Sequence, residues 1–380
     1  MRGLAALSVV VFHIGWNNPL YSLAYVRNSY LMVDFFFVLS GFVIALNYNS
    51  RIVDIASTAR FIWLRFWRLY PLHFFLLIVF LMNEIVKWIA HVRFGIEGIT
   101  PAFGINDGWA FLSNLFLVQA LDLQSSLTFN WPAWSISVEF YTYLVFALVL
   151  LITRRVMLAA AIISMASAMT LLAIGMKGRD YSYDFGFIRC LLGFFLGVLA
   201  YGAYRGLHEK AVLRNASVTM DVRQISAVVA VVAIFAVIVL LSVKPSANYD
   251  FALPPLAAVL VTSVAMAPDI GLSRLLRLKP IVWLGTVSYS IYMVQYAVIN
   301  IGGEIIFHVL KIPVASLPPN SHGPIFMTNS ITGGILMIVS VAAVLVLSQF
   351  TYTYIEAPFR EWSKKARSNG PGLEASQPVR

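Results

Sequence analysis

Charged residues are scarce in this chain of 380 residues, because only 12% are Asp, Glu, Lys or Arg while 60% are hydrophobic. A soluble domain carries about a quarter charged residues, so the composition excludes a water-soluble fold for most of the chain. The single cysteine, Cys190, excludes an intrachain disulfide framework. The longest stretches without a strongly apolar run are about 20 residues, too short for an independent core. We therefore expect no separate soluble domain.

Long apolar runs are abundant instead. Ten of them come close to the ~20 residues that a helix needs to cross a bilayer. They cover residues 3–22, 29–47, 70–89, 134–153, 156–175, 186–204, 225–242, 250–267, 282–305 and 329–353. The pattern predicts an all-α membrane protein with about ten transmembrane helices, and a membrane domain of residues 1–360. Residues 361–380 are predicted to form a polar, disordered cytoplasmic tail.

An eleventh apolar run, residues 109–123, is shorter, and the loop charges decide whether it crosses. The net charge is +10, and the Lys and Arg residues gather in short connections between apolar runs. If residues 109–123 do not cross, most of this charge falls on one side, which the positive-inside rule assigns to the cytoplasm. We therefore predict a re-entrant or interfacial segment, cytoplasmic termini and an inner (plasma) membrane location. The same distribution argues against nucleic-acid binding.

Three ionisable residues lie inside predicted spans, where each needs a structural or functional reason. His13 follows Arg2 by eleven positions, about 16 Å along a helix axis, which places it near the membrane midplane. Asp34 and Glu139 each lie about five residues in from the predicted outer surface. All three residues are therefore expected at a similar depth, in the outer half of the membrane. A neutral imidazole is a suitable general base. A histidine bonded between helices, and carboxylates that hold helix ends, are the structural alternatives.

A basic and aromatic segment, residues 60–71, lies on the predicted cytoplasmic side. Its sequence is Arg-Phe-Ile-Trp-Leu-Arg-Phe-Trp-Arg-Leu-Tyr-Pro. Arg65 and Arg68 share a helix face, and the aromatic residues suit the level of the lipid headgroups. One interpretation is an anchor on anionic membrane lipid. The other is a polyphosphate site, because arginine offers bidentate donors to phosphate.

Taken in order, these stretches resemble the landmarks of the acyltransferase-3 family of integral membrane acyltransferases. The basic residue and histidine of residues 2–13, separated by ten residues, resemble the first-helix motif of the family. The later landmarks are Asp34-Phe-Phe-Phe-Val-Leu-Ser-Gly-Phe42, Arg65-Phe-Trp-Arg68 with Tyr70-Pro71, Trp134-Ser-Ile-Ser-Val-Glu139, Gly285-Thr-Val-Ser-Tyr-Ser-Ile-Tyr292 and Glu356-Ala-Pro358. One departure is Gln295, which stands where the family often has a histidine.

The resemblance implies transfer of an acyl group, commonly acetyl, from cytoplasmic acetyl-CoA to a hydroxyl of an exported or surface carbohydrate. Arg2, Arg65 and Arg68 would bind the phosphates of the acyl-CoA donor. His13 would deprotonate the acceptor or take the acyl group itself, with Asp34 orienting the imidazole. Glu139 would support the site. The carbohydrate would contact Ser40, Trp134, Ser135, Ser137 and Tyr141, and no metal is expected.

A proton-coupled transporter is the main alternative, since intramembrane His, Asp and Glu residues could form a proton relay. A relay gives no reason for the arginine-rich segment, and no internal repeat is apparent. The sequence leaves the acceptor open between a polymer, a lipid-linked intermediate and a small glycoside. It also leaves acetyl and succinyl open as the acyl group.

Overall fold

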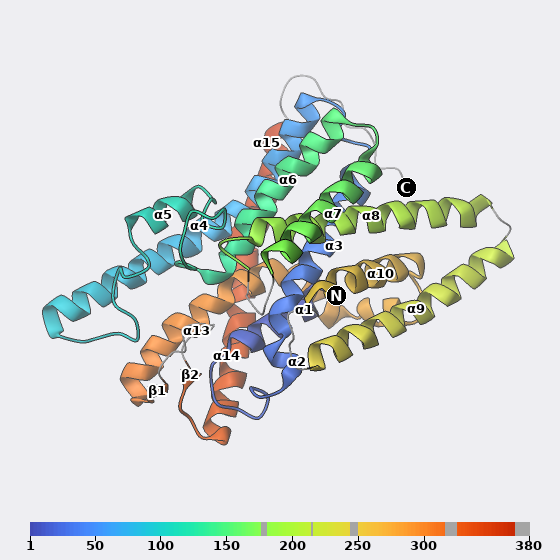
Figure 1. Cartoon of the computed structure of the whole chain (residues 1–380). Helices are drawn as coiled ribbons and strands as arrows, with labels where there is room; N and C mark the ends of the chain where they lie inside the picture. The colour runs from blue at the N-terminus through green and yellow to red at the C-terminus, as the bar shows by residue number, and fades with distance from the viewer. Residues whose placement is uncertain (176–180, 214–215, 244–249, 316–324, 369–380) are drawn as a thin grey trace.

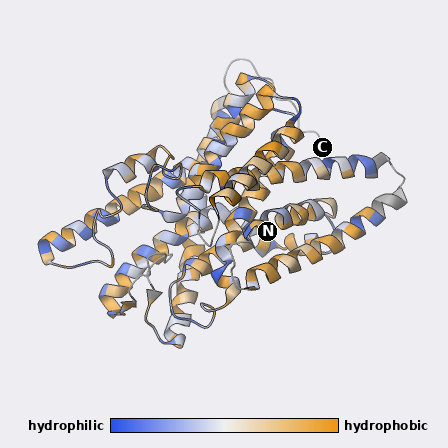
Figure 2. Cartoon of the chain, in the orientation of Figure 1, coloured by the Kyte–Doolittle hydropathy of each residue, from blue (hydrophilic) through white to orange (hydrophobic). Residues whose placement is uncertain are grey.

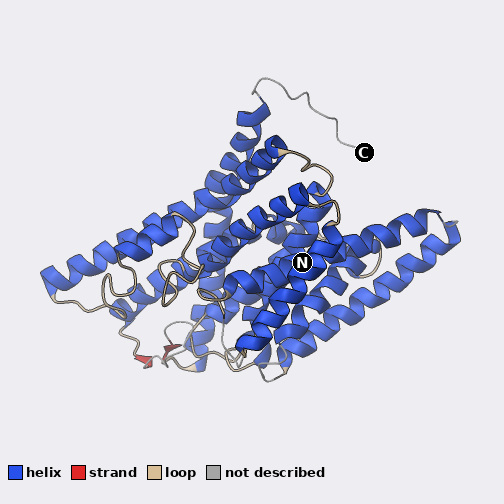
Figure 3. Cartoon of the chain, turned by 45° about the horizontal axis from the view of Figure 1, so that its top comes forward, coloured by secondary structure: helices blue, strands red, loops and turns tan. Residues whose placement is uncertain are grey.

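Helices make up most of the computed structural model, which describes residues 1–175, 181–213, 216–243, 250–315 and 325–368 (Figures 1 and 3). Eight helices in these ranges are long and apolar enough to cross a membrane, and two shorter apolar helices accompany them. The long ones contain α3 (Met32–Tyr48), α4 (Ile55–Phe94), α6 (Trp134–Ile152), α7 (Val156–Ile174), α8 (Gly186–Leu213), α9 (Ala216–Ser242), α13 (Ser288–Leu310) and α14 (Ser330–Thr351). The shorter ones contain α1 (Arg2–His13) and α10 (Leu253–Met266). The predicted all-α membrane protein is confirmed.

Apolar residues are not confined to inward-facing stripes of these helices (Figure 2). Large side chains such as Val228, Phe235 and Ile338 are more than 60% exposed. A water-soluble protein buries such side chains, whereas lipid solvates them. The outer faces therefore fit a bilayer, and the chain is an integral membrane protein.

Short elements connect the long helices. They are α2 (Ala24–Arg27), α5 (Gly108–Leu115), α11 (Leu272–Leu276), α12 (Lys279–Thr286), α15 (Ala357–Ser368), the 3-10 turns Ser29–Leu31, Trp131–Ala133 and Asp250–Ala252, and the π-helical turn Tyr352–Glu356. The strands β1 (Val314–Ala315) and β2 (Ile325–Phe326) pair antiparallel. The Phe326 N–H donates to the carbonyl of Gly15, so this ribbon holds the chain just beyond α1.

The first predicted span is shorter than expected. Residues 3–22 were predicted to cross, but α1 ends at His13 and is only about 18 Å long, less than the hydrocarbon thickness. Residues 15–19, Gly-Trp-Asn-Asn-Pro, are rich in turn formers, and Asn18 Oδ1 accepts from the Leu20 N–H. His13 is therefore the last residue of its helix rather than a residue in the middle of a span.

The fourth helix is much longer than predicted, because the basic segment and the third span form one continuous helix, α4. Its 40 residues extend about 60 Å, twice the hydrocarbon thickness. Asp54 begins it as an N-cap whose Oδ1 accepts from the Ser57 N–H. In contrast, α5 has only 8 residues and is too short to cross, as predicted for residues 109–123.

The predicted domain boundary after residue 360 falls inside a helix and needs correction. Residues 357–368 form α15, which packs on the N-terminal part of α4. The Trp63 Nε1–H donates to the Ser363 carbonyl at 3.2 Å, and Trp67 stacks on Phe359 with 5.7 Å between ring centroids. The helical part of the predicted tail thus belongs to the membrane domain. Residues 369–380 lie outside the described ranges.

Helices α3 and α8 approach each other with almost no space between their backbones. A Cβ atom on Gly41 would collide with the Phe194 carbonyl, and one on Gly197 would collide with the Val38 carbonyl. Small residues at such crossings let transmembrane helices pack closely. This contact fixes α3 against α8, and it therefore fixes the ionisable residues that the two helices carry.

Candidate active site

Three adjoining cavities cross the centre of the helix bundle. The basic cavity, of about 80 Å³, is lined by three arginines and Glu139. The middle cavity, of about 40 Å³, shares Arg2, Glu139 and Tyr289 with it. The His13 cavity, of about 30 Å³, shares Val33 and Tyr292 with the middle cavity. The row of shared walls joins the predicted phosphate-binding residues to the predicted base.

The basic cavity contains all three arginines that the sequence assigned to the donor. Arg2 comes from the start of α1, while Arg65 and Arg68 come from successive turns of α4. Arg65 Nη2 donates to the Tyr48 hydroxyl at 3.2 Å. Its Nε is buried and has no hydrogen-bond partner among the described residues. A buried, unpartnered guanidinium donor beside two further arginines is suited to a polyanion.

Glu139 lies between the basic and middle cavities rather than beside His13 as predicted. Its Oε1 accepts from Ser40 Oγ at 2.6 Å and from the Tyr143 hydroxyl at 2.5 Å. Ala133 and Trp134, at the start of α6, are buried against the rest of the protein, at 0% and 7% exposed. The rotation of α6, which counting residues along the sequence does not specify, brings Glu139 to Ser40 of α3.

His13 ends α1 with its ring against the His13 cavity. Its Nδ1 lies 3.0 Å from the Val9 carbonyl oxygen, which can only accept, so the proton of the neutral ring is on Nδ1. Nε2 then carries the lone pair that a general base or nucleophile needs. The ring packs edge-on against Phe12 and Tyr296 at centroid distances of 5.0 and 6.3 Å. A backbone carbonyl and two aromatic rings therefore orient the imidazole.

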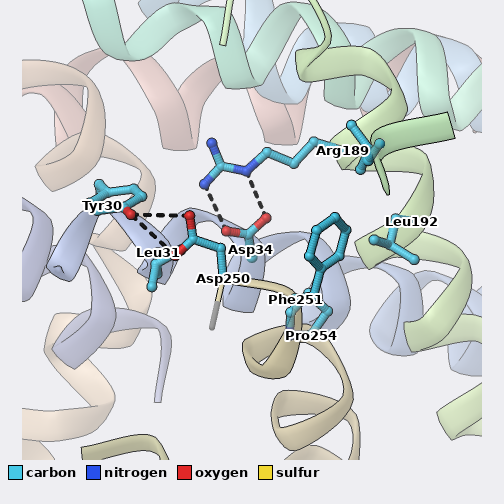
Figure 4. Close-up of a pocket in the computed structure, with 9 residues that line it drawn as sticks. Tyr30, Leu31, Asp34, Arg189, Leu192, Asp250, Phe251 and Pro254 are labelled. Atoms are coloured by element: carbon cyan, nitrogen blue, oxygen red, sulfur yellow. Dashed lines mark hydrogen bonds and ion pairs between the residues drawn. The ribbon is translucent and has the colours of Figure 1, made fainter. Parts of the chain in front are cut away.

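Asp34 was predicted to orient His13, but its carboxylate binds Arg189 of α8 (Figure 4). Arg189 donates from Nε to Oδ1 at 2.8 Å and from Nη2 to Oδ2 at 2.7 Å. The Arg189 guanidinium also lies 5.4 Å from the ring of Trp134, which lines the His13 cavity. Arg189 thus connects Asp34 with Trp134 of the His13 cavity. Depth alone could not show this, because it does not specify the rotation of α3.

Arg189 is the principal residue that sequence reasoning missed. It is 5% exposed and stands within the apolar run 186–204, where an arginine requires a partner. A buried carboxylate in one span and a buried arginine in another formed a detectable signal. The pairing could not be derived, because several other spans also carry charges.

Removal of one partner of the Asp34–Arg189 pair is expected to be strongly destabilising. Arg189→Ala leaves a buried carboxylate without compensation, at a cost of about 3–5 kcal/mol. The double variant Asp34→Leu with Arg189→Met should lose much less, because no charge remains buried. Thermal unfolding in detergent measures both, with Arg205→Ala, which breaks the exposed pair to Glu209, as the control. An Arg189→Ala midpoint equal to the control's would contradict the prediction.

Three of the five predicted carbohydrate contacts line the cavities. Ser40 lines the basic cavity, Ser135 the middle cavity and Trp134 the His13 cavity. Ser137 and Tyr141, also predicted as contacts, line none of the three cavities. The Ser137 hydroxyl donates to the Leu117 carbonyl and the Tyr141 hydroxyl to the Phe116 carbonyl. They attach α6 to the segment that follows α5.

The model of the family described as "Acyltransferase domain", acyltransferase 3, matches residues 1–349. The chain belongs to the acyltransferase-3 family. The "O-acetyltransferase OatA" of Staphylococcus aureus is 22% identical over 96% of this chain and 57% of its own length. The "Putative peptidoglycan O-acetyltransferase YrhL" of Bacillus subtilis is 24% identical over 95% of this chain and 54% of its own.

A third relative is closer to this acyltransferase-3 chain in length. The "Acyltransferase MdmB" of Streptomyces mycarofaciens is 27% identical over 94% of this chain and 89% of its own. The chain therefore spans somewhat more than half of OatA and YrhL but most of MdmB. No solved structure matches it.

The late tyrosines of this acyltransferase-3 chain are site residues that the sequence did not assign. Tyr289 separates the basic and middle cavities, and its hydroxyl donates to the Leu69 carbonyl. Tyr292 separates the middle and His13 cavities, and its hydroxyl donates to the Pro132 carbonyl at 3.2 Å. Their i, i+3 spacing in a family landmark was the available signal. Gln295, by contrast, is fully buried and lines none of the three cavities.

Proposed function

We propose that this protein is a membrane O-acyltransferase that moves an acetyl group from cytoplasmic acetyl-CoA to a hydroxyl of an exported or surface carbohydrate. The observation that carries the proposal is the row of cavities between three arginines and His13. Family membership and the names of OatA and YrhL as O-acetyltransferases support the reaction class.

The basic cavity would bind the phosphates of the donor. Arg2, Arg65 and Arg68 supply the positive charge, and the unpartnered Arg65 Nε supplies a ready donor. Arginine suits phosphate because its fork of N–H groups matches two oxygens. The narrow middle cavity, lined by Phe36, Phe37 and Tyr289, would then guide the acyl-carrying arm toward His13.

His13 would supply the base for the transfer. Its Nε2 takes the proton of the acceptor hydroxyl as that oxygen attacks the thioester carbonyl carbon. The C–O bond forms, the C–S bond breaks, and the departing thiolate takes the proton back from the imidazolium. The products are the acetyl ester and the free thiol of coenzyme A. Alternatively, Nε2 attacks the thioester carbon and displaces the thiolate, giving an acetyl-imidazole. The acceptor hydroxyl then attacks the acetyl carbon, the C–N bond breaks, and the hydroxyl proton passes to the thiolate.

The proposed orientation puts the basic cavity on the cytoplasmic side of the inner (plasma) membrane and His13 toward the outside. The positive-inside distribution of Lys and Arg supports this orientation. Acetyl-CoA carries several charges and does not cross a bilayer. Transfer should therefore occur only when acetyl-CoA is supplied on the side of the membrane where the basic cavity lies.

Sealed vesicles of defined orientation test the proposal. Inside-out vesicles that contain the protein and its endogenous acceptor should form acetyl ester from external acetyl-CoA. Right-side-out vesicles should do so only after permeabilisation. Vesicles without the protein are the control. If neither preparation forms acetyl ester after permeabilisation, the proposal is contradicted. Accumulation of the acetyl group inside the vesicles without esterification would favour a transporter.

A further inference from the structure

A large cavity lies on a different face of α1 from the three site cavities. It has a volume of about 550 Å³, and we call it the α1–α9 groove because these two helices contribute more of its lining than any other helix. Helix α2, which packs on α9 (Figure 1), contributes Tyr25 and Val26 to the lining. Wall residues such as Leu23 and Ile238 are nearly half exposed, so the groove opens to the surrounding membrane.

The groove is apolar because its few polar groups bond to one another. Ser8 Oγ and the Tyr25 hydroxyl are 3.0 Å apart, and Ser29 Oγ donates to the Tyr25 carbonyl at 2.8 Å. The remaining lining is aliphatic apart from Phe35 and the methionines. A cavity of this size and polarity within a bilayer takes a hydrocarbon chain, since water would find no partner there.

Arg27, the last residue of α2, lies between the groove and the His13 cavity in the sense that its neighbour Val26 lines the groove and its ring contact Phe12 lines the His13 cavity. Arg27 follows the groove residue Val26 and makes no ion pair with any described carboxylate. Its guanidinium lies 6.0 Å from the Phe12 ring, and that ring lies 5.0 Å from the ring of His13. Phe12 therefore lies next to both the Arg27 guanidinium and the ring of the proposed base, His13.

We infer that the acceptor is a carbohydrate carried on a lipid phosphate, with its hydrocarbon tail in the α1–α9 groove and its phosphate on Arg27. The inference rests on the proposed function and specifies its substrate class. An apolar groove with an arginine next to its lining residue Val26 complements a hydrocarbon tail that ends at an anion. A sugar beyond that phosphate lies at the His13 cavity, where its hydroxyl meets Nε2.

Binding of farnesyl phosphate and of farnesol, measured in phosphatidylcholine nanodiscs, tests the groove without any transfer reaction. The wild type should bind the phosphate about 10-fold or more tightly than the alcohol. Arg27→Gln should remove that difference, and Arg27→Lys should restore part of it. Ser8→Trp, which fills the groove, should weaken both ligands about 10-fold or more. Ala161→Trp, on the exposed face of α7, is the matched control.

Equal binding by the wild type and Ser8→Trp would overturn the groove assignment. Loss of farnesyl phosphate binding in phosphatidylglycerol nanodiscs would also overturn it, because the site would then belong to ordinary phospholipid.

The acceptor assignment is tested in cells fed with radiolabelled acetate. Label should enter a solvent-extractable lipid and be released with its sugar by mild acid, which cleaves sugar phosphates. Ser8→Trp should lower this label at least several-fold. Detection of labelled, acetylated polymer without any labelled lipid would overturn the lipid-linked acceptor but not the proposed function. Absence of acetyl ester from every fraction would overturn the proposed function, whereas the binding results would still decide the groove.

Discussion

Replacement of His13 by alanine is expected to lower acetyl transfer by about 10²–10⁴-fold, the usual contribution of a general base. The imidazole ends α1 at the far end of the cavity row, with Nδ1 3.0 Å from the Val9 carbonyl oxygen. Without it, the acceptor hydroxyl has no base at the thioester. The rate of ester formation in inside-out vesicles under single-turnover conditions measures the effect.

A matched histidine variant separates this effect from damage to the fold. His208→Ala removes an exposed ring that stacks only on Tyr204 among its ring contacts, and it should keep full activity. Binding of coenzyme A should be unchanged in His13→Ala, because the arginines are intact. Full activity of His13→Ala would show that the chemistry occurs elsewhere, although the family assignment would stand.

Substitution of Arg65 or Arg68 by alanine is expected to weaken coenzyme A binding by about 10- to 100-fold, because each charge-assisted hydrogen bond to phosphate contributes about 1.5–3 kcal/mol. Both guanidiniums line the basic cavity. The lysine variants should recover only part of the affinity, since lysine lacks the planar fork. Titration calorimetry with coenzyme A in detergent measures the change.

The control for this prediction is Arg274→Ala, which removes an exposed arginine from α11. Its affinity for coenzyme A should equal that of the wild type. Single-turnover rates at saturating donor should change little in Arg65→Ala, which distinguishes a binding role from a chemical one. Unchanged affinity in both arginine variants would move the donor site away from the basic cavity.

The membrane fold was largely predictable because hydrophobic length is a local property of the sequence. Ten apolar runs correspond to helices of the structure, and the charge distribution correctly left residues 109–123 outside the spans. Errors arose where local chemistry interrupts or extends a run. The turn after His13 shortens α1, while the basic segment continues unbroken into the next span and lengthens α4.

For the candidate site, the sequence indicated which residues to consider but not how they are arranged in space. The arginines, His13 and Glu139 all line the cavity row, because an ionisable residue in an apolar run needs a reason to be there. Their pairing depends on helix rotation and on where a helix starts within the membrane, which composition does not record. For that reason Asp34 was assigned to His13 although Arg189 holds it.

The division of the passage into small compartments has a consequence for the cell. Cavities of about 80, 40 and 30 Å³ each hold only a few water molecules. Tyr289 and Tyr292 stand between them, and both hydroxyls already donate to backbone carbonyls. Among the described residues, this row therefore consists of separate small cavities rather than one open pore. If the protein transfers an acyl group as proposed, this division lets the group cross while the membrane keeps its ion gradients.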